Sequence, residues 1–333
     1  MGRTNFIAGT LAAALGVLVA AGTATAQMFP SRTITLVAPT AAGGPGDIAA
    51  RVVAERMATI LGQAIVIENM AGAGGIQGTA RVARAEPDGY TLLVHQTGIA
   101  VAPALDPPPP FNIEKDLTTV GLVNTSYLVL VGRKSFAPDD FAGLGAWMKQ
   151  PGNRIKFAHP GAGTLGHLAT LVFARSASLE KSVEIDAVSY RGVAPAMTDI
   201  VGGHVDLVWG GAAVSTPLLN AGTIKGYLVG GPKRLAQIPA LPSATEAGRA
   251  ELDMPFWHAM FAPAATPKPV IDRLSAALNE ALADAKVIKS YGDGGAEPFP
   301  ANMRSPEVAH AFVRSEIARW SGVVRLNAGS MKP

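Results

Sequence analysis

The sequence predicts an α/β protein built from two successive series of strands and helices. Short runs of apolar and β-branched residues, such as 33–39 and 64–69, alternate with longer stretches whose apolar residues recur at helical spacing. In three places a glycine-rich segment joins a strand run to a helix run. The chain has 333 residues, which is enough for one large or two ordinary domains.

The first 26 residues have the pattern of a secretory signal peptide. Arg3 precedes an uncharged run from Phe6, and Ala24-Thr25-Ala26 supplies the small residues of a cleavage site. The strongly apolar part is short for the ~20 residues of a membrane-spanning helix. We therefore expect cleavage after Ala26, export to the periplasm and a soluble mature protein.

The composition excludes several classes of function. A chain without cysteine has no disulfide framework, thiolate metal site or cysteine nucleophile. The formal charge of +3, without a basic cluster, argues against nucleic acid as a partner. The six histidines form no His-x-x-x-His pair, and no G-x-S-x-G turn is present. We expect no metal, no cofactor and no enzymatic activity.

The first series occupies residues 33–96. The strand run 33–39 leads through a glycine loop into 46–61, where Ile48, Val52, Val53, Met57 and Leu61 lie at helical spacing. The run 64–69, a second glycine loop and residues 78–96 repeat the pattern. This order predicts parallel strands.

The second series begins near residues 127–136 and continues to residue 231, with strand runs at 154–158, 204–211 and 224–231. Beyond it, Pro267 and Pro269 mark the entry to an amphipathic helix whose expected core residues are Val270, Leu274, Ala277 and Leu278. A last amphipathic helix is predicted to bury Val308, Phe312 and Ile317, with Trp320 packed inside the protein.

The three glycine-rich loops, residues 38–47, 69–79 and 159–167, are nearly uncharged and each leads into a predicted helix. Free N–H groups and about half a positive charge at a helix N-terminus bind an anion without Lys or Arg. Small residues let the ligand approach the backbone closely. The alternative for each single loop is an ordinary tight turn.

The third loop leaves a second function open. Gly161, Gly163 and Gly166 match G-x-G-x-x-G, and Asp186 follows 20 residues after Gly166, as in dinucleotide-binding turns. An exported oxidoreductase binding a dinucleotide at residues 161–166 is therefore an alternative. None of the loops has the Gly-Lys-Ser or Gly-Lys-Thr of a Walker loop.

Several motifs together resemble a known family. They are the segment 29–93, "HPGAGTLGHLA" (159–169), "YRGVAPAMTDIVGGHVDL" (190–207) and "FAPAATPKPVIDRL" (261–274). In this order they resemble the Bug-type periplasmic solute receptors of tripartite tricarboxylate transporters, over nearly the whole mature chain.

This resemblance implies a two-lobed periplasmic-binding-protein fold of type II, the Venus flytrap, in which each lobe is a doubly wound sheet with flanking helices. Lobe 1 would comprise residues 27–125 and 231–333, and lobe 2 residues 126–230. The protein would capture a small carboxylate between the lobes, as a monomer, and deliver it to the membrane permease. A receptor that signals to a sensor kinase is an alternative.

The resemblance also implies the site. In relatives, main-chain N–H groups of the first two loops hold a carboxylate, and the third loop meets the distal group. Carried over to this chain, the ligand-binding residues would be Thr40, Ala41, Ala42, Gly43, Gly44, Gly72, Ala73, Gly74, Gln96, Thr97, His159, Gly161, Ala162, Gly163, Thr164, His167, Arg191, Trp209, Gly210 and Gly211.

Two departures from the family pattern bear on specificity. Arg191 stands where relatives often have Lys, and it would either clamp a carboxylate or lie solvated on the surface. Trp209-Gly210 replaces an aromatic residue followed by Asp, so an acidic partner for a ligand amine is missing. We infer a ligand without an amine, either an aliphatic dicarboxylate or an aromatic one of the terephthalate kind stacked on Trp209. The alternative is that Trp209 packs beneath its loop.

Overall fold

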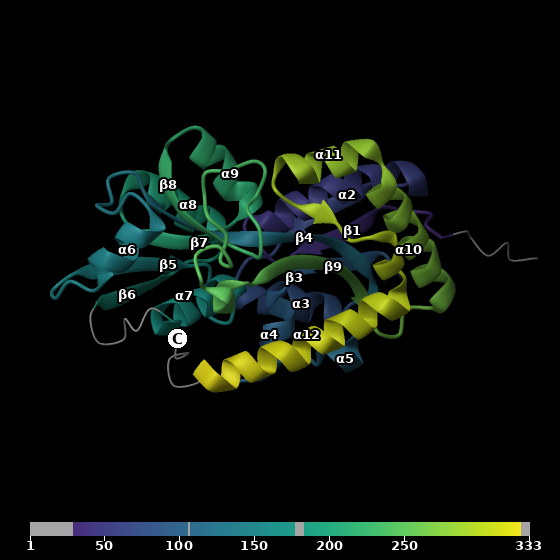
Figure 1. Ribbon diagram of the computed structural model, residues 1–333. Coiled ribbons are helices and arrows are strands. Elements are labelled where there is room, and N and C mark those ends of the chain that lie inside the picture. Colours follow the sequence, from purple (N-terminus) through teal and green to yellow (C-terminus); the bar gives the residue numbers. More distant parts are fainter. Residues whose placement is uncertain (1–28, 106, 177–182, 328–333) are drawn as a thin grey trace, which may run out of the picture.

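A computed structural model describes residues 29–105, 107–176 and 183–327. The expected signal peptide lies outside these residues. Within them, one mixed sheet of ten strands runs through the whole molecule (Figure 1). Its order is β2-β1-β3-β9-β4-β7-β5-β6, and β8 and β10 pair with β4 as additional neighbours.

The first lobe is built on three parallel strands, as predicted. They are β1 (Ile34–Ala38), β2 (Ile65–Asn69) and β3 (Thr91–Gln96), connected by α2 (Pro45–Leu61) and α3 (Ile76–Ala83). In α2, Val53, Met57 and Leu61 are buried against the sheet, and Gly62 ends the helix in the left-handed conformation.

The second lobe repeats this arrangement around three further parallel strands. They are β5 (Arg154–His159), β6 (Glu184–Ser189) and β7 (Leu207–Gly211). The helices of this lobe are α6 (Phe141–Met148), α7 (Leu165–Ser176), α8 (Val193–Gly202) and α9 (Ala212–Asn220), and β8 (Ile224–Gly230) lies on the other side of β4.

A single long strand, β4 (Leu117–Arg133), connects the lobes. Up to Tyr127 it pairs with β9 (Pro255–Pro263) of the first lobe, and from Leu128 it pairs with β7 and β8 of the second lobe. The sequence pattern placed a new block near residue 127, so it missed the first ten residues of this strand. It did not predict β9 as a strand.

The C-terminal part returns to the first lobe. It forms α10 (Lys268–Ala283), α11 (Ala285–Asp293), β10 (Glu297–Pro298) and α12 (Pro306–Asn327). The entry to α10 is as predicted, and Trp320 in α12 is buried. The prediction for Val308 is wrong, since its side chain is 41% exposed.

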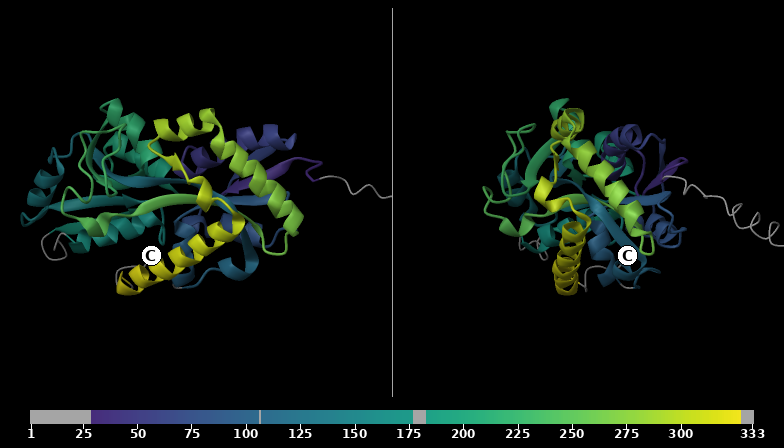
Figure 2. Two further views of the ribbon diagram at one scale, coloured as in Figure 1. Left: turned by 45° about the vertical axis from the view of Figure 1, so that its right-hand side comes forward. Right: turned by 90° about the vertical axis from the view of Figure 1, so that its right-hand side faces the viewer.

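Short helical segments complete the described chain: η1 (Ala73–Gly75), α4 (Gly98–Val101), η2 (Ala102–Ala104), α5 (Ile113–Asp116), η4 (Ala250–Leu252) and η5 (Ala301–Met303). Figure 2 shows the second lobe at one end of the molecule and α10 at the other, with α12 running along one side. α12 packs on β4 and α4 and touches α7 of the second lobe.

The hydrophobic core has three parts. One lies in the first lobe between the sheet and α2, α10 and α11, one lies in the second lobe under α8 and α9, and the largest continues through both lobes. The structure is therefore an α/β protein with two lobes, as the predicted fold class requires. None of the helices in the described part of the chain is long and apolar enough to cross a membrane.

Candidate functional site

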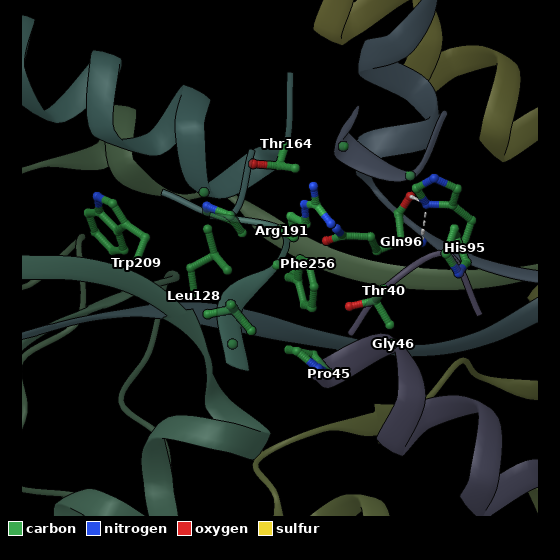
Figure 3. A pocket seen from close by; sticks show the side chains of 18 of the residues that line it. Thr40, Pro45, Gly46, His95, Gln96, Leu128, Thr164, Arg191, Trp209 and Phe256 are labelled. Carbon is green, nitrogen blue, oxygen red and sulfur yellow. Dashed lines mark hydrogen bonds between the residues drawn. The ribbon is translucent and has the colours of Figure 1, made fainter. Parts of the chain in front are cut away.

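The carboxyl ends of parallel strands from both lobes meet at one cleft. Its lining includes Thr40 beyond β1, Gln96 at the end of β3, Pro160 beyond β5, Arg191 beyond β6 and Gly211 at the end of β7. Ligands of open α/β sheets bind at such strand ends. The cleft is the best candidate for the functional site of the protein (Figure 3).

The lobes are closed on each other around this cleft. Its volume is about 40 Å³, whereas a cavity of roughly 10–15 Å³ already holds one water molecule. A Cβ atom on Gly74 would lie 2.7 Å from the carbonyl oxygen of Ala162, and one on Gly211 would lie 2.8 Å from Cγ of Pro45. Glycine at these two positions is what lets the lobes approach so closely.

In the first loop, two of the predicted amides have hydrogen-bond partners within the loop. The N–H of Gly43 donates to Oδ2 of Asp47 over 2.9 Å, and the N–H of Gly44 donates to the carbonyl oxygen of Ala41 over 3.0 Å. Gly46, in the first turn of α2, lines the cleft, and a first-turn N–H has no partner within its helix. The N–H of Gly46 is therefore a candidate donor to a ligand in the cleft.

Asp47 stabilises this loop from inside. Its carboxylate is buried and accepts hydrogen bonds from Gly43, Arg51 and Asn69. Burial alone would raise its pKa, but the hydrogen bonds from Arg51, Gly43 and Asn69 outweigh burial and lower the pKa. Since Arg51 neutralises the carboxylate, Asp47 does not prevent an anion from binding nearby.

The second loop has an unusual backbone. Gly72, Ala73, Gly74 and Gly75 all have positive φ, and Ala73, at φ 46°, is the one described residue other than glycine that does so. Gly72, Gly74 and Gly75 line the cleft. A strained non-glycine residue in such a loop is typical of a binding site.

In the third loop, hydrogen bonds inside the loop occupy the predicted donors. The hydroxyl of Thr164 donates to the carbonyl oxygen of Gly161 over 2.7 Å and accepts from the N–H of His167, so it caps α7. The N–H of Gly163 donates to Nδ1 of His167. Thr164 lines the cleft, but its hydroxyl proton is used within the loop.

The two histidines of this loop are structural in character. The rings of His159 and His167 stack with centroids 4.5 Å apart, and both side chains are buried. Burial, together with the charge of the neighbouring His159, lowers the pKa of His167 to about 4. Burial also lowers the pKa of His159. Both rings are neutral at pH 7, and neither lines the cleft.

Arg191 is the one charged side chain among the described residues that line the cleft. In Figure 3 it lies near the centre, with Trp209 on one side and Thr40, Gln96 and His95 on the other. His95 is neutral at pH 7, because burial lowers its pKa to about 4. The cleft therefore combines one guanidinium, the start of α2 and no carboxylate, which favours an anionic ligand.

Trp209 belongs more to the core than to the cleft. It lines the cleft but is 2% exposed, and its indole meets the ring of Phe173 edge-on at 6.3 Å. Leu128, Val193 and Phe256 add apolar surface beside it. This packing favours the alternative that Trp209 lies beneath its loop.

The predicted site residues divide into two groups. Those lining the cleft are Thr40, Gly72, Gly74, Gln96, Thr164, Arg191, Trp209 and Gly211. Those in the same loops or strands but outside the lining are Ala41, Ala42, Gly43, Gly44, Ala73, Thr97, His159, Gly161, Ala162, Gly163, His167 and Gly210. Thr97, for example, is held to β9 by hydrogen bonds with Trp257.

Sequence reasoning missed several lining residues: Pro39, Pro45, Gly46, Gly75, Val94, His95, Leu128, Pro160, Gly166, Gly192, Val193 and Phe256. The strand-end rule would have found Pro39 and His95, and the helix-start argument would have found Gly46. Phe256 had no such signal, because β9 was not predicted.

Comparison with known proteins decides the family. The family model described as "Tripartite tricarboxylate transporter family receptor" matches residues 49–328. The chain belongs to this receptor family. Protein BugT from Bordetella pertussis is 32% identical over 328 residues, covering 97% of this chain and 98% of BugT.

Two solved structures are also similar to this chain. The periplasmic binding protein BugD matches with a TM-score of 0.85 at 34% identity, over 92% of this chain and all of BugD. MatC from Rhodopseudomonas palustris with bound malate matches with a TM-score of 0.82 at 36% identity, over 89% of this chain and all of MatC. The Bug-type assignment made from sequence motifs is confirmed.

Proposed function

We propose that this receptor works in the periplasm, closes its two lobes around a small carboxylate and delivers it to the membrane subunits of a tripartite tricarboxylate transporter. The lobes are residues 27–125 with 231–333, and residues 126–230. The protein acts as a binder and not as an enzyme. MatC, one of its structural relatives, has bound malate, which supports a carboxylate ligand.

The observation that carries the proposal is the charge distribution across the cleft. Arg191 comes from the second lobe and the N-terminal turn of α2 from the first, and both present positive charge to the same space. Asp47, the buried carboxylate closest in sequence to Gly46, is neutralised by Arg51. An anion held between the lobes satisfies both sides at once.

The cleft favours a small aliphatic acid over an aromatic one. The closed cleft has about 40 Å³, so an acid of either class requires some opening of the lobes. Trp209, the residue on which the aromatic hypothesis depends, packs against Phe173. We therefore propose an aliphatic mono- or dicarboxylate of about the size of malate, bound with slight opening of the lobes.

The dinucleotide alternative has less support. A ribose-binding carboxylate belongs at the carboxyl end of its strand. Asp186 is the third residue of β6, pairs in register with Lys156 and is exposed, three residues before the strand ends at Ser189. The geometry of β6 thus gives Asp186 no route to a ligand at residues 161–166.

A thermal-shift panel tests the proposal. The purified mature protein is heated with C3 to C6 mono- and dicarboxylates, with benzoate and terephthalate, and with nicotinamide dinucleotides. A ligand present at a hundred times its Kd adds about 2.7 kcal/mol to the free energy of unfolding. We expect stabilisation by an aliphatic acid and none by the dinucleotides. No stabilisation by any carboxylate would refute the proposal.

A further inference from the structure

The guanidinium of Arg191 forms no hydrogen bond and no ion pair with the residues that the structure describes. It reaches into the cleft between Trp209 and Gln96 (Figure 3). A side chain that is free before binding and fixed afterwards loses conformational entropy, which lowers the affinity for a ligand. The residues on either side of Arg191 therefore determine how well its guanidinium is positioned.

Tyr190, the residue before Arg191, is held at three points. Its N–H donates to the carbonyl oxygen of His159, at the end of β5, over 2.9 Å. Its ring packs against the hydrophobic core of the second lobe. Its hydroxyl donates to Oδ2 of Asp199 over 2.5 Å, a length typical of a strong hydrogen bond to a carboxylate.

The hydrogen bond between Tyr190 and Asp199 ties the chain in front of α8 to the body of that helix. Asp199 lies on α8, which begins at Val193, so the bond extends along almost two turns of the helix. Burial, together with the hydrogen bond to Asp199 and its charge, raises the pKa of Tyr190 to about 12. The hydroxyl therefore keeps its proton, and the bond persists, at every pH at which binding is measured.

Gly192, the residue after Arg191, lies against the first lobe. It is the N-cap of α8 and has φ 129°, a conformation that favours glycine. A Cβ atom on Gly192 would lie 3.3 Å from Cβ and 3.5 Å from the main-chain nitrogen of Ala41. Arg191 thus lies between a residue anchored in its own lobe and a residue that contacts the opposite lobe in the closed state.

We propose that the hydrogen bond between Tyr190 and Asp199 positions Arg191 for the carboxylate. Tyr190 and Asp199 are then positioning residues, which raise the affinity although neither lines the cleft. This inference rests on the proposed function, because it concerns the arginine that holds the carboxylate there. Without the bond, the segment before α8 loses one of its three anchors, and Arg191 has more conformational freedom to lose on binding.

The first test compares Y190F with the wild-type protein by isothermal titration with malate, or with the acid of the thermal-shift panel that stabilises the protein most. Fixing one additional side chain on binding lowers affinity about twofold to tenfold, and we expect a loss of this size in Y190F. In a protein that already carries R191Q, adding Y190F should change the affinity by less than about 1.5-fold. This double-mutant cycle separates positioning of Arg191 from a general effect on the fold.

Y227F is the matched control. Tyr227 of β8 is buried in the same lobe, outside the lining of the cleft, and its hydroxyl donates to the carbonyl oxygen of Pro138 over 3.0 Å. The variant removes the same hydroxyl group from a tyrosine of the second lobe. It should lower Tm without changing the affinity for the acid.

Two variants of Asp199 test the same bond from its other end. D199N and D199L both remove the negative charge, but only asparagine keeps an oxygen that accepts from Tyr190. Since a lost negative charge alone would strengthen the binding of an anion, the comparison between the two variants isolates the hydrogen bond. D199L should bind the acid about twofold to tenfold more weakly than D199N.

The results also separate this inference from the proposed function. If the wild-type protein binds no acid of the panel, both fail. If R191Q weakens binding but Y190F binds like the wild-type protein, only the positioning role fails. An equal loss from Y190F with and without Arg191, or equal affinities of D199N and D199L, would likewise overturn it.

Discussion

Gly211→Ala should weaken ligand binding by blocking closure while leaving the fold intact. Gly211 has φ −65° and ψ 146°, a conformation that alanine adopts without strain. The added methyl would lie 2.8 Å from Cγ and 3.2 Å from Cβ of Pro45, and 3.5 Å from Cε1 of Phe256. Pro45 and Phe256 belong to the first lobe and Gly211 to the second. The clash therefore acts between the lobes and disappears when they open.

The expected loss follows from the cost of overpacking. Inserting a methyl group into a closely packed contact costs about 1–3 kcal/mol. Here that cost applies only to the closed state, so it reduces ligand affinity about fivefold to 150-fold. Gly211 is also the N-cap of α9, where alanine is clearly less favourable than glycine, so we expect a loss of stability of about 1 kcal/mol as well.

Gly210→Ala is the matched control. A methyl group there would lie 2.5 Å from Oγ of Ser215 and 3.3 Å from the sulfur of Met197, which are both in the second lobe. This variant should lower Tm more than Gly211→Ala does, without holding the lobes apart.

Isothermal titration with the best carboxylate of the panel measures affinity, and small-angle scattering measures the radius of gyration with and without ligand. If Gly211→Ala binds and compacts like the wild-type protein, the inter-lobe contact does not limit closure and the reasoning fails.

Three further outcomes are expected. Arg191→Gln should reduce carboxylate affinity roughly tenfold to 150-fold, since a hydrogen bond to a charged group contributes about 1.5–3 kcal/mol, and a calorimetric change below threefold would place Arg191 outside the site. The free energy of unfolding, measured by urea titration, should be highest above pH 6.5 and fall toward pH 4. Burial lowers the pKa of His95 and His167 to about 4 in the folded protein, so the unfolded chain takes up protons first as the pH falls. Each of the two histidines should account for a loss of about 3 kcal/mol, and a flat profile would contradict their burial. Trp209→Ala should cost about 3–5 kcal/mol of stability and weaken aliphatic and aromatic acids alike; a selective loss for aromatic acids would restore the stacking role.

The sequence pattern predicts elements well where one face is buried and one is exposed. α10 shows the helical stripe that such a position requires, whereas β1, which is buried at four of its five positions, is recognised by its short β-branched run. β4 and β9 lie at the centre of the sheet and are buried along most of their length, so their sequences carry no alternation. Central strands of this kind are recognised only when the whole sheet is known.

The error at Val308 has a similar physical basis. The buried positions of α12 include Ala309, Val313, Glu316 and Trp320, one residue away from the predicted stripe. Glu316 is buried because its Oε2 accepts hydrogen bonds from Nε1 of Trp257 over 2.8 Å and of Trp320 over 3.0 Å. An acidic residue and a small alanine in the buried stripe conceal its register from a pattern based on large apolar residues.

For the cleft, the sequence indicated three loops that contribute lining residues, but not which of their residues line it. Glycine content was taken as a sign of free amides in the first loop. In the structure, Gly43 has φ 76°, and its N–H donates a hydrogen bond to Asp47. The conformation of the turn therefore explains why this residue is glycine. The way the loop folds onto α2 decides which amides stay free, and a local sequence pattern cannot predict this.

The same charges that favour an anion also explain how a ligand can control closure. In the closed cleft, Arg191 from one lobe and the positive end of α2 from the other face a shared space of about 40 Å³. Without an anion, two groups of the same sign approach each other, which favours the open state. A bound carboxylate turns this repulsion into two attractions, and it shifts the population only by its differential affinity for the closed state. Neutral loops therefore suit this receptor better than loops rich in Lys, because each added cation would raise the cost of closing an empty cleft. In the proposed function, one guanidinium opposite one helix start makes closure depend on the charge of the ligand.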